Sequence, residues 1–410
     1  MTYVEFVDKT QVENICACLV RVPERVVLVG GDKKALPKLA KRYQSVLSER
    51  GHEVEFACCP VSRNKLENIV QKLSEIVEAY DDCVFDVTGG EDLMLVAVGI
   101  VRERYADKHI QLQRVNLYTN EVFDCDADGE VASGKVPALS VEENVRVYGG
   151  KVVFEHERKD TTYCWNMTEA FRDDIRAMWE ICHNDHSRWN KQISTLRALS
   201  TCCAEGELHT AAPLCDVEIQ LKKDEAPPLL WWEPLLMKLK SRGFITHYAN
   251  DGATVEVAYR DAEIKRCLTK EGQVLEMKVY LEALECCDEN GPAYNDVMTG
   301  VYIDWDGTLQ QTSQGDTCNE IDVMMMYGVL PVFVSCKNGK VKMEELYKLN
   351  TVAERFGQAY ARKVLVAPGI RGRAAVDLRE RAEAMRIRVV DKLPDGSWDE
   401  LMRSFRNTNV

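Results

Sequence analysis

The sequence predicts an α/β protein built from three parts, and three patterns support this prediction. Apolar runs alternate with amphipathic helical runs at the start of the chain, which indicates a doubly wound parallel sheet over residues 1–155. A helical run followed by a hairpin pattern indicates a winged-helix-like middle part, residues 156–265. Two apolar strands joined by a tight turn indicate an αβ core over residues 266–410.

The composition supports full-sized hydrophobic cores and argues against several classes of protein. The chain has 410 residues, of which 46% are hydrophobic, and its formal net charge is −14. That charge argues against a protein that coats nucleic acid over its whole surface, and no apolar run approaches the length of a membrane span. The acidic N-terminus lacks the apolar core of a signal peptide, so we expect a mature cytoplasmic protein. The 16 cysteines lack CxxC spacing, which favours free thiols over zinc sites.

In the N-terminal part each predicted strand is followed by a helix. The first strand is RVVLVG at residues 25–30, an apolar run of the kind that a parallel strand buried on both faces requires. Short loops join the elements, as expected for a doubly wound sheet. The other predicted elements are a leading helix at 11–19, a helix at 36–50, a strand at 51–58, a helix at 63–79, a strand at 82–87 and a helix from 93 to about 105.

Glycine-rich turns follow two of these strands, at the edge where parallel sheets bind ligands. Main-chain N–H groups that glycine leaves uncovered at a helix N-terminus suit phosphate or another anion. Neither turn matches the dinucleotide fingerprint or a Walker motif, so chain reversal without a ligand is the alternative interpretation. The first turn contains Gly30, Gly31, Asp32 and Lys33, and the second contains Thr88, Gly89, Gly90, Glu91 and Asp92.

The middle part is predicted to be helical with one hairpin. Helices are expected at residues 168–183, 187–200 and 229–242, and the last of them ends at Gly243. The turn Asn250-Asp251-Gly252 joins two short strands into a hairpin. Helix then hairpin is the pattern of a winged helix, which we interpret as a spacer and dimer contact rather than a DNA reader.

Polar groups converge at one end of the two predicted C-terminal strands, residues 323–326 and 329–334. Glu320 and Asp322 precede the first strand, and Ser335 and Lys337 end the second. Because side chains alternate along a strand, Glu320 and Asp322 share a face, and so do Ser335 and Lys337. If the strands are antiparallel neighbours, all four groups meet.

This convergence has two interpretations. Two carboxylates on one face can hold a hard cation such as Mg²⁺ or Mn²⁺, and a nearby ammonium group can orient an attacking water or stabilise developing negative charge. A structural ion pair at a strand end is the alternative. A helix predicted over residues 269–285 carries Glu276, which is either a third member of the site or a solvated surface glutamate.

The C-terminal part resembles the PD-(D/E)xK nuclease core, on the evidence of NEIDV around Asp322 and SCKNG around Lys337. The resemblance implies a restriction-endonuclease-like αβ fold and a helix glutamate, Glu276, that completes the site. Ser335 stands where that superfamily has an acid, and Glu320 would supply the missing charge. The ligands implied for Mn²⁺ or Mg²⁺ are Glu276, Glu320 and Asp322.

The N-terminal part resembles the CARF sensor domain, a Rossmann-like module that binds cyclic oligoadenylate. The residues that carry this resemblance are Val29-Gly30-Gly31-Asp32 and DVTGGED at residues 86–92. Together, the two ends resemble the CARF nucleases of type III CRISPR defence. The resemblance implies a homodimer, activated by cyclic tetra-adenylate bound at both glycine-rich turns, that cleaves DNA, with RNA as a second candidate substrate.

The sequence leaves two rival functions open. The rivals are a sensor or transcription regulator without catalysis and an endonuclease that needs no activator.

The segment from Arg355 to Arg388 holds nine basic and three acidic residues, so nine minus three leaves it at +6. Such residues make contacts to phosphate, and internal ion pairs on solvated helix faces are the alternative use.

Overall fold

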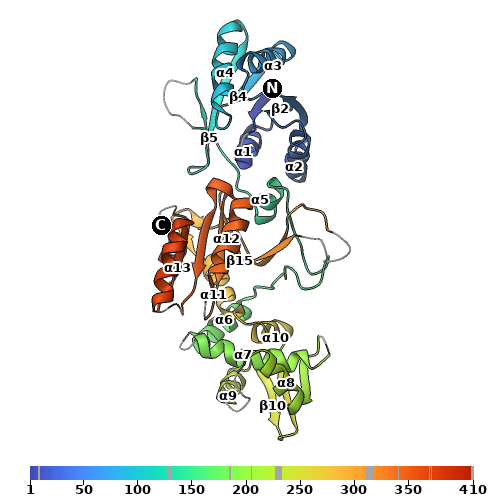
Figure 1. Cartoon of the computed structure of the whole chain (residues 1–410), viewed down its shortest axis with the longest axis vertical. Helices are drawn as coiled ribbons and strands as arrows, with labels where there is room; N and C mark the ends of the chain where they lie inside the picture. Colours follow the sequence, from blue (N-terminus) through green and yellow to red (C-terminus); the bar gives the residue numbers. More distant parts are fainter. Residues whose placement is uncertain are drawn as a thin grey trace.

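The computed structural model describes residues 1–7, 10–126, 132–183, 186–204, 206–226, 233–309, 317–339, 341–368, 370 and 372–407. Its elements form three tiers along the long axis of the molecule (Figure 1). The N-terminal elements form the upper tier, the C-terminal elements the central one, and the middle of the chain the lower one. The helical middle part therefore lies beyond the C-terminal sheet and does not separate it from the N-terminal sheet.

A seven-stranded sheet with strand order β3-β2-β1-β4-β5-β6-β7 forms the upper tier. The strands from β3 to β5 are parallel, and β6 and β7 add an antiparallel edge. This arrangement confirms the predicted doubly wound fold. The strands are β1 (Thr2–Phe6), β2 (Arg25–Gly30), β3 (Glu55–Pro60), β4 (Asp82–Asp86), β5 (His109–Asn116), β6 (Glu121–Asp124) and β7 (Ala132–Lys135).

Strand β1 is one of the elements that the sequence analysis did not predict, together with β5, β6 and β7. It is the central strand, between β2 and β4, and all five of its residues are buried. Its short run contains Glu5, a residue type that is rarely buried, and this charge hides the strand signal. The helices of this tier are α1 (Gln11–Arg21), α2 (Leu36–Glu49), α3 (Leu66–Ala79), α4 (Asp92–Arg104) and α5 (Val141–Val147).

A six-stranded mixed sheet with strand order β18-β17-β16-β15-β14-β8 forms the central tier. Strand β8 (Lys151–Val152) lies within the range 1–155 assigned to the N-terminal domain, but it pairs with β14. The chain thus enters the second sheet before the expected boundary. The other strands are β14 (Asp296–Asp304), β15 (Cys318–Tyr327), β16 (Leu330–Cys336), β17 (Arg362–Val366) and β18 (Ile387–Val390).

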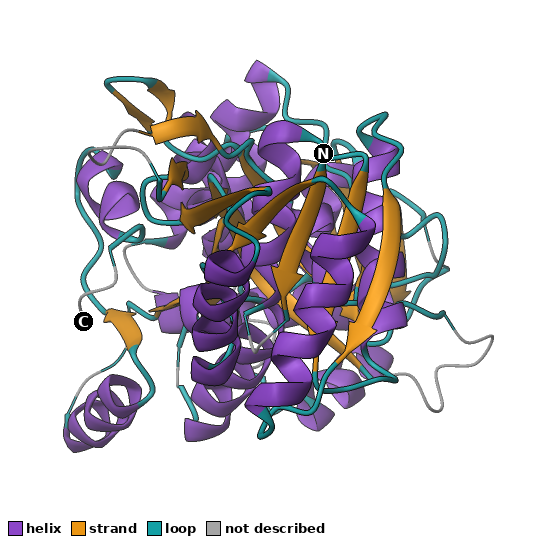
Figure 2. Cartoon of the chain, turned by 90° about the horizontal axis from the view of Figure 1, so that it is seen from above, coloured by secondary structure: helices purple, strands orange, loops and turns teal. Residues whose placement is uncertain are grey.

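Helices pack against the strands on both sides, as the view from above shows (Figure 2). The apolar core is continuous between the upper two tiers, because Tyr3 and Leu19 belong to the same buried cluster as Met324 and Phe333. The upper and central tiers therefore pack against each other through this shared core. The helices of the central tier are α11 (Gln273–Glu285), α12 (Met343–Phe356), the 3-10 helix η2 (Gln358–Tyr360), α13 (Arg373–Ala384) and α14 (Asp399–Ser404), with a short hairpin β12 (Cys287–Asp288) and β13 (Gly291–Pro292).

The lower tier combines helices with a three-stranded sheet of order β10-β11-β9. Its hairpin β10–β11 is antiparallel and turns at Gly252, as predicted. Part of the helix expected at 229–242 lies outside the described residues. The elements are α6 (Glu169–Cys182), α7 (His186–Thr201), β9 (His209–Pro213), α8 (Leu214–Lys223), α9 (Glu233–Ser241), β10 (Ile245–Asn250), β11 (Thr254–Tyr259) and α10 (Ala262–Thr269).

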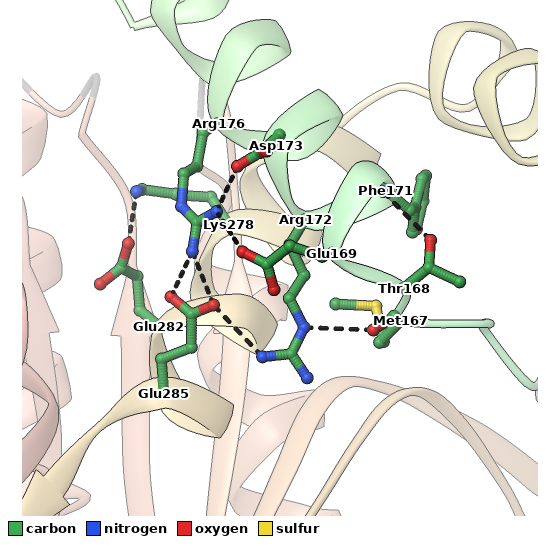
Figure 3. Close-up of polar contacts among 10 residues, drawn as sticks. All are labelled: Met167, Thr168, Glu169, Phe171, Arg172, Asp173, Arg176, Lys278, Glu282 and Glu285. Carbon is green, nitrogen blue, oxygen red and sulfur yellow. Dashed lines mark hydrogen bonds and ion pairs between the residues drawn. The ribbon is translucent and has the colours of Figure 1, made fainter.

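Ion pairs fix α6 against α11, the helix that carries Glu276 (Figure 3). The Arg176 guanidinium donates to both carboxylate oxygens of Glu285, at 2.7 and 2.8 Å. Arg172 donates to the same carboxylate at 3.4 Å. The lower tier therefore holds the C-terminal end of α11 in place. Within the described part of the chain, no helix has the length and apolar character needed to cross a membrane.

Candidate functional site

The two strands at the centre of the candidate site are antiparallel neighbours. In their ladder Val323 of β15 lies opposite Val334 of β16, and Met324 lies opposite Phe333. This register carries Asp322 and Ser335 to the same end of the pair, as the alternation of side chains requires. The polar groups that flank the two strands are therefore brought together.

One oxygen of Asp322 accepts three hydrogen bonds from the end of β16. The donors to Oδ2 are the Cys336 main-chain N–H at 2.6 Å, the Ser335 hydroxyl at 3.1 Å and the Lys337 ammonium at 3.2 Å. Burial lowers the pKa of Lys337, but the nearby carboxylates of Asp322 and Glu345 outweigh this effect, so the pKa is raised overall and the ammonium form is favoured. Oδ1 accepts no hydrogen bond from any residue that the structure describes.

Glu276 reaches this region from the first turn of α11. Its side chain is buried, with 5% of the residue exposed, and its Oε2 accepts a hydrogen bond from Gln273 at 3.2 Å. Burial, together with the negative charge of Asp322, raises the pKa of Glu276 to about 8. The interpretation of Glu276 as a solvated surface residue is therefore wrong. Because its carboxylate form is destabilised in this way, a nearby cation would stabilise that form.

Glu320 lies on the solvent side and is paired with a lysine that the sequence analysis did not single out. Lys270 Nζ lies 2.7 Å from Glu320 Oε1 and 3.9 Å from Glu276 Oε2. The ammonium group of Lys270 thus lies near both carboxylates. Among the described residues Glu320 has no contact with Lys337, so three of the four groups predicted to meet, Asp322, Ser335 and Lys337, come together, and Glu320 pairs with Lys270 instead.

The residues near Asp322 have the chemistry of a site for a hard cation. Carboxylate oxygens are the ligands that Mg²⁺ and Mn²⁺ prefer, and Asp322 Oδ1 has no protein donor among the described residues. In the described part of the chain, no three His, Cys, Asp or Glu side chains are grouped closely enough to hold an ion. Lys270 instead supplies positive charge between Glu320 and Glu276.

Three neighbours of the site were missed because their roles arise only from the fold. Lys270 lies in a turn between α10 and α11, where Gly272 adopts a φ of +81°. The predicted helix over 269–285 therefore begins later, at Gln273, and the glycine was the available signal. On β14, Thr299 donates to the main-chain oxygen of Asp322 at 2.9 Å, and the next residue, Gly300, has a φ of +58°.

The two glycine-rich turns lie at one edge of the upper sheet. They follow β2 and β4, which flank the central β1, so the carboxyl ends of both strands point to the same edge. Arg63, which follows β3, links the turns. Its side chain occupies the space that a Cβ on Gly31 would need, and its guanidinium pairs with Glu91 at 2.9 Å. Asp32 accepts hydrogen bonds from the main-chain N–H groups of Lys34 and Ala35.

Beneath the second turn lies a buried carboxyl pair, Asp86 and Glu5, which are register partners on β4 and β1. Asp86 accepts from the Thr88 main-chain N–H at 2.7 Å, and the Thr88 hydroxyl accepts from Val115 N–H at 2.6 Å. Burial raises the pKa of Asp86 to about 6. Burial raises the pKa of Glu5 as well, and the negative charge of Asp86 raises it further. This pair anchors the turn from below.

The chain combines a doubly wound sheet with a mixed sheet that carries Asp322 on one strand and Lys337 just after the adjoining one, and solved structures share this fold. The chain shares its fold with the solved structure of protein VC1899 from Vibrio cholerae, at 17% identity and a TM-score of 0.70, over 99% of this chain and 96% of the other. No family model matches the sequence, and no curated protein matches it.

Two further solved structures share the fold. Can2 from Sulfobacillus thermosulfidooxidans, in complex with cyclic tetra-adenylate, is 16% identical with a TM-score of 0.67, over 100% of this chain and 99% of Can2. A type III CRISPR defence DNA nuclease activated by cyclic oligoadenylate is 14% identical with a TM-score of 0.50, over 91% of this chain and 46% of the other. The resemblance drawn from the sequence is thus confirmed for the fold.

Proposed function

We propose that this protein is a cyclic tetra-adenylate-activated, metal-dependent endonuclease of type III CRISPR defence that cleaves DNA, with RNA as a second candidate substrate. One observation carries the proposal: Asp322 accepts hydrogen bonds from Lys337 and Cys336 on the adjoining strand, and it lies close enough to the buried Glu276 to raise the pKa of that group. The fold shared with Can2, which binds cyclic tetra-adenylate, supports the sensing half of the proposal.

In this proposal Asp322, Glu276 and Glu320 would hold Mn²⁺ or Mg²⁺. The bound cation would polarise a phosphoryl oxygen and lower the pKa of a coordinated water. Lys337, whose ammonium form is favoured, would orient the attacking water and stabilise negative charge on the phosphate. Ser335 would steady Asp322 through its hydroxyl. Lys270 would exchange its carboxylate partners for solvent or substrate phosphate when the cation binds.

The activator would contact the two glycine-rich turns of each subunit in a homodimer. A two-fold ring of four nucleotides matches an interface in which the same patch is used twice. Gly30, Gly31, Asp32 and Lys33 would meet the ring from one side, and the turn from Thr88 to Asp92 from the other. Binding must favour one arrangement of the subunits over another in order to switch cleavage on. In this proposal the sensor, spacer and nuclease units are residues 1–155, 156–265 and 266–410, except that β8 within the first range belongs to the sheet of the nuclease unit.

The test is plasmid cleavage by the full chain with Mn²⁺ and cyclic oligoadenylates of different ring size. We expect cutting only with the four-membered ring, and none by Asp322→Asn, which keeps an acceptor for the Cys336 N–H but lacks the charge. The matched control is Asp306→Asn, an exposed aspartate in the turn after β14. Cutting without an activator would favour a constitutive endonuclease, and activator binding without any cutting would favour a sensor without catalysis.

A further inference from the structure

A cleft lined by basic residues lies between the upper and central tiers, and the proposed nuclease function does not use it. A cavity of about 400 Å³ is lined by Tyr118, Arg362, Lys363, Arg386 and Arg388, among others. A neighbouring cavity of about 260 Å³ shares Tyr118, Arg362 and Arg388 and adds Arg406. The shared walls make one continuous feature. We call the six residues Tyr118, Arg362, Lys363, Arg386, Arg388 and Arg406 the basic cleft.

The basic cleft is at the opposite end of the central sheet from Asp322. Arg362 begins β17 and lies beside Val332 of the parallel strand β16, whereas Lys337 follows the far end of β16. The second cavity also reaches Tyr327 and Leu330, at the turn between β15 and β16. Because β16 is seven residues long, roughly 20 Å separate the two ends at about 3.3 Å per residue. The two sites are therefore distinct.

The basic cleft holds more positive charges than nearby carboxylates neutralise. Among the described residues, the linings contain five cationic residues and one carboxylate, that of Glu354. Lys363 pairs with Glu354 at 3.0 Å, and Arg406 pairs with Asp288 at 2.8 Å. Within the described part of the chain, none of the three arginines at positions 362, 386 and 388 pairs with a carboxylate.

Two of these arginines are held in place by main-chain oxygens. Arg362 is only 6% exposed and donates to the carbonyls of Tyr360 at 3.0 Å and Arg406 at 3.3 Å. Arg388 donates to the carbonyl of Ser404 at 2.9 Å. Burial without a countercharge lowers the pKa of Arg362. Holding guanidinium groups in a recess without carboxylate partners is costly unless an anion binds there.

We propose that the basic cleft binds the di- or triphosphate group of a small ligand, either a nucleotide or an inorganic polyphosphate. Guanidinium groups recognise phosphate oxygens in pairs, and several of them favour an anion that carries more than one charge. A volume of about 400 Å³ is within the size of a small-molecule site.

The ligand would touch both upper tiers of the molecule. Tyr118 belongs to the turn after β5 of the N-terminal sheet, is 55% exposed, and packs edge-on against Tyr360 with ring centroids 5.6 Å apart. The Arg362 guanidinium lies over the Tyr118 ring at 5.6 Å. The cations of the cleft all come from the C-terminal part, at β17, at β18 and just before it, and after α14. Phosphate binding would therefore tie the sensor part to the nuclease part independently of the cyclic activator.

The test is calorimetric titration of the full chain with tripolyphosphate, ATP and adenosine in the presence of EDTA. We expect tripolyphosphate and ATP to bind and adenosine not to bind. The double variant Arg386→Gln/Arg388→Gln should lose at least tenfold in affinity for both phosphates. The matched control is Arg379→Gln/Arg381→Gln, which removes two arginines from the outer face of α13. Tighter binding of ATP than of tripolyphosphate would identify a nucleotide as the ligand, and equal binding would identify the phosphate chain alone.

Three results would overturn the proposal: no binding by the unaltered protein, equal affinity in the two double variants, or displacement by duplex DNA at a stoichiometry of one. Arg386→Gln alone guards against misfolding, because this exposed side chain has no carboxylate partner among the described residues. Cleavage triggered by cyclic tetra-adenylate without ATP should be unchanged in the cleft variant. A failure of this proposal is therefore distinguishable from a failure of the nuclease proposal.

Discussion

Each of the two main sheets carries buried carboxyl groups at its centre, but their surroundings are opposite. Asp322 has a lysine ammonium at 3.2 Å and its side chain is 12% exposed. Asp86 is 2% exposed and is bonded to a main-chain N–H and the Gln113 amide, with Glu5 beside it. A neighbouring cation favours the charged form of a carboxyl group, whereas burial among neutral donors favours the protonated form. The first arrangement suits a carboxylate that binds a cation, and the second suits a carboxyl group that positions a turn.

The largest expected effect separates catalysis from simple ion pairing in the C-terminal sheet. Lys337 and Lys348 both contact Glu345 at 3.4 Å, but in the described part of the chain only Lys337 also reaches Asp322. We expect Lys337→Met to lower the cleavage rate with saturating activator by roughly 100- to 1,000-fold, the usual worth of one such group. Lys348→Met, the matched control, should cut normally. Equal losses in both variants would mean that only surface charge matters.

In the N-terminal sheet the corresponding change should alter sensitivity to the activator and leave the maximal rate intact. Thr88→Val keeps the shape of the side chain but removes the acceptor for Val115 N–H. Leaving that N–H without an acceptor raises the free energy of the turn conformation that the activator would bind by about 1–3 kcal/mol. We therefore expect roughly a tenfold rise in the activator concentration needed for half-maximal cleavage. The measurement is an activator titration of cleavage. A fall in the rate at saturation would break the division between sensing and catalysis.

The contrast also explains what the sequence could and could not predict. Asp322 and Lys337 were predictable because period-two alternation and one tight turn bring them together from nearby positions. Lys270 was not, because its approach to Glu320 depends on how the fold brings the turn between α10 and α11 beside β15. Strand β1 was missed because Glu5 resembles a surface residue until Asn14 supplies its hydrogen bond at 3.0 Å.

The basic segment shows the same limit. Its residues were expected to contact phosphate, with internal ion pairs on solvated helix faces as the alternative. The structure turns several of them into the far end of the sheet, since β17 runs parallel to β16 and begins there. Composition predicts charge, but only strand direction decides which end of the sheet receives it.

The pH dependence of stability should distinguish the two carboxyl clusters. The folded-state pKa of Asp86 is about 6, against a usual value of 3.8. Between these values the folded protein binds more protons than the unfolded chain, so this group's contribution is full at low pH and is lost as the pH rises through about 6. We expect Asp86→Asn to flatten that fall in the free energy of unfolding, measured by urea titration from pH 4 to pH 7.

The amide of Asn at position 86 can be accommodated, because Gln113 Oε1 is buried without a hydrogen-bond partner and would accept from it after a flip of the Gln113 amide. Glu24→Gln on the surface is the control and should leave the profile unchanged. A variant with the unaltered slope would show that Asp86 is ionised throughout this range and that the two clusters are alike after all.

The smallest effect concerns the ion pairs that hold α11, the helix that carries Glu276. Arg176 and Glu285 are 38% and 30% exposed, so solvent screens their attraction, and we expect Glu285→Gln to lower the free energy of unfolding by about 0.5 kcal/mol. Cleavage should not change, because the buried face of α11 fixes the position of Glu276. Asp173→Asn, which removes the charge of a partner of Arg176 that is 68% exposed, should have no measurable effect. If Glu285→Gln slows cleavage strongly while stability falls only slightly, the outer ion pairs position the catalytic helix, and the candidate site extends into the lower tier.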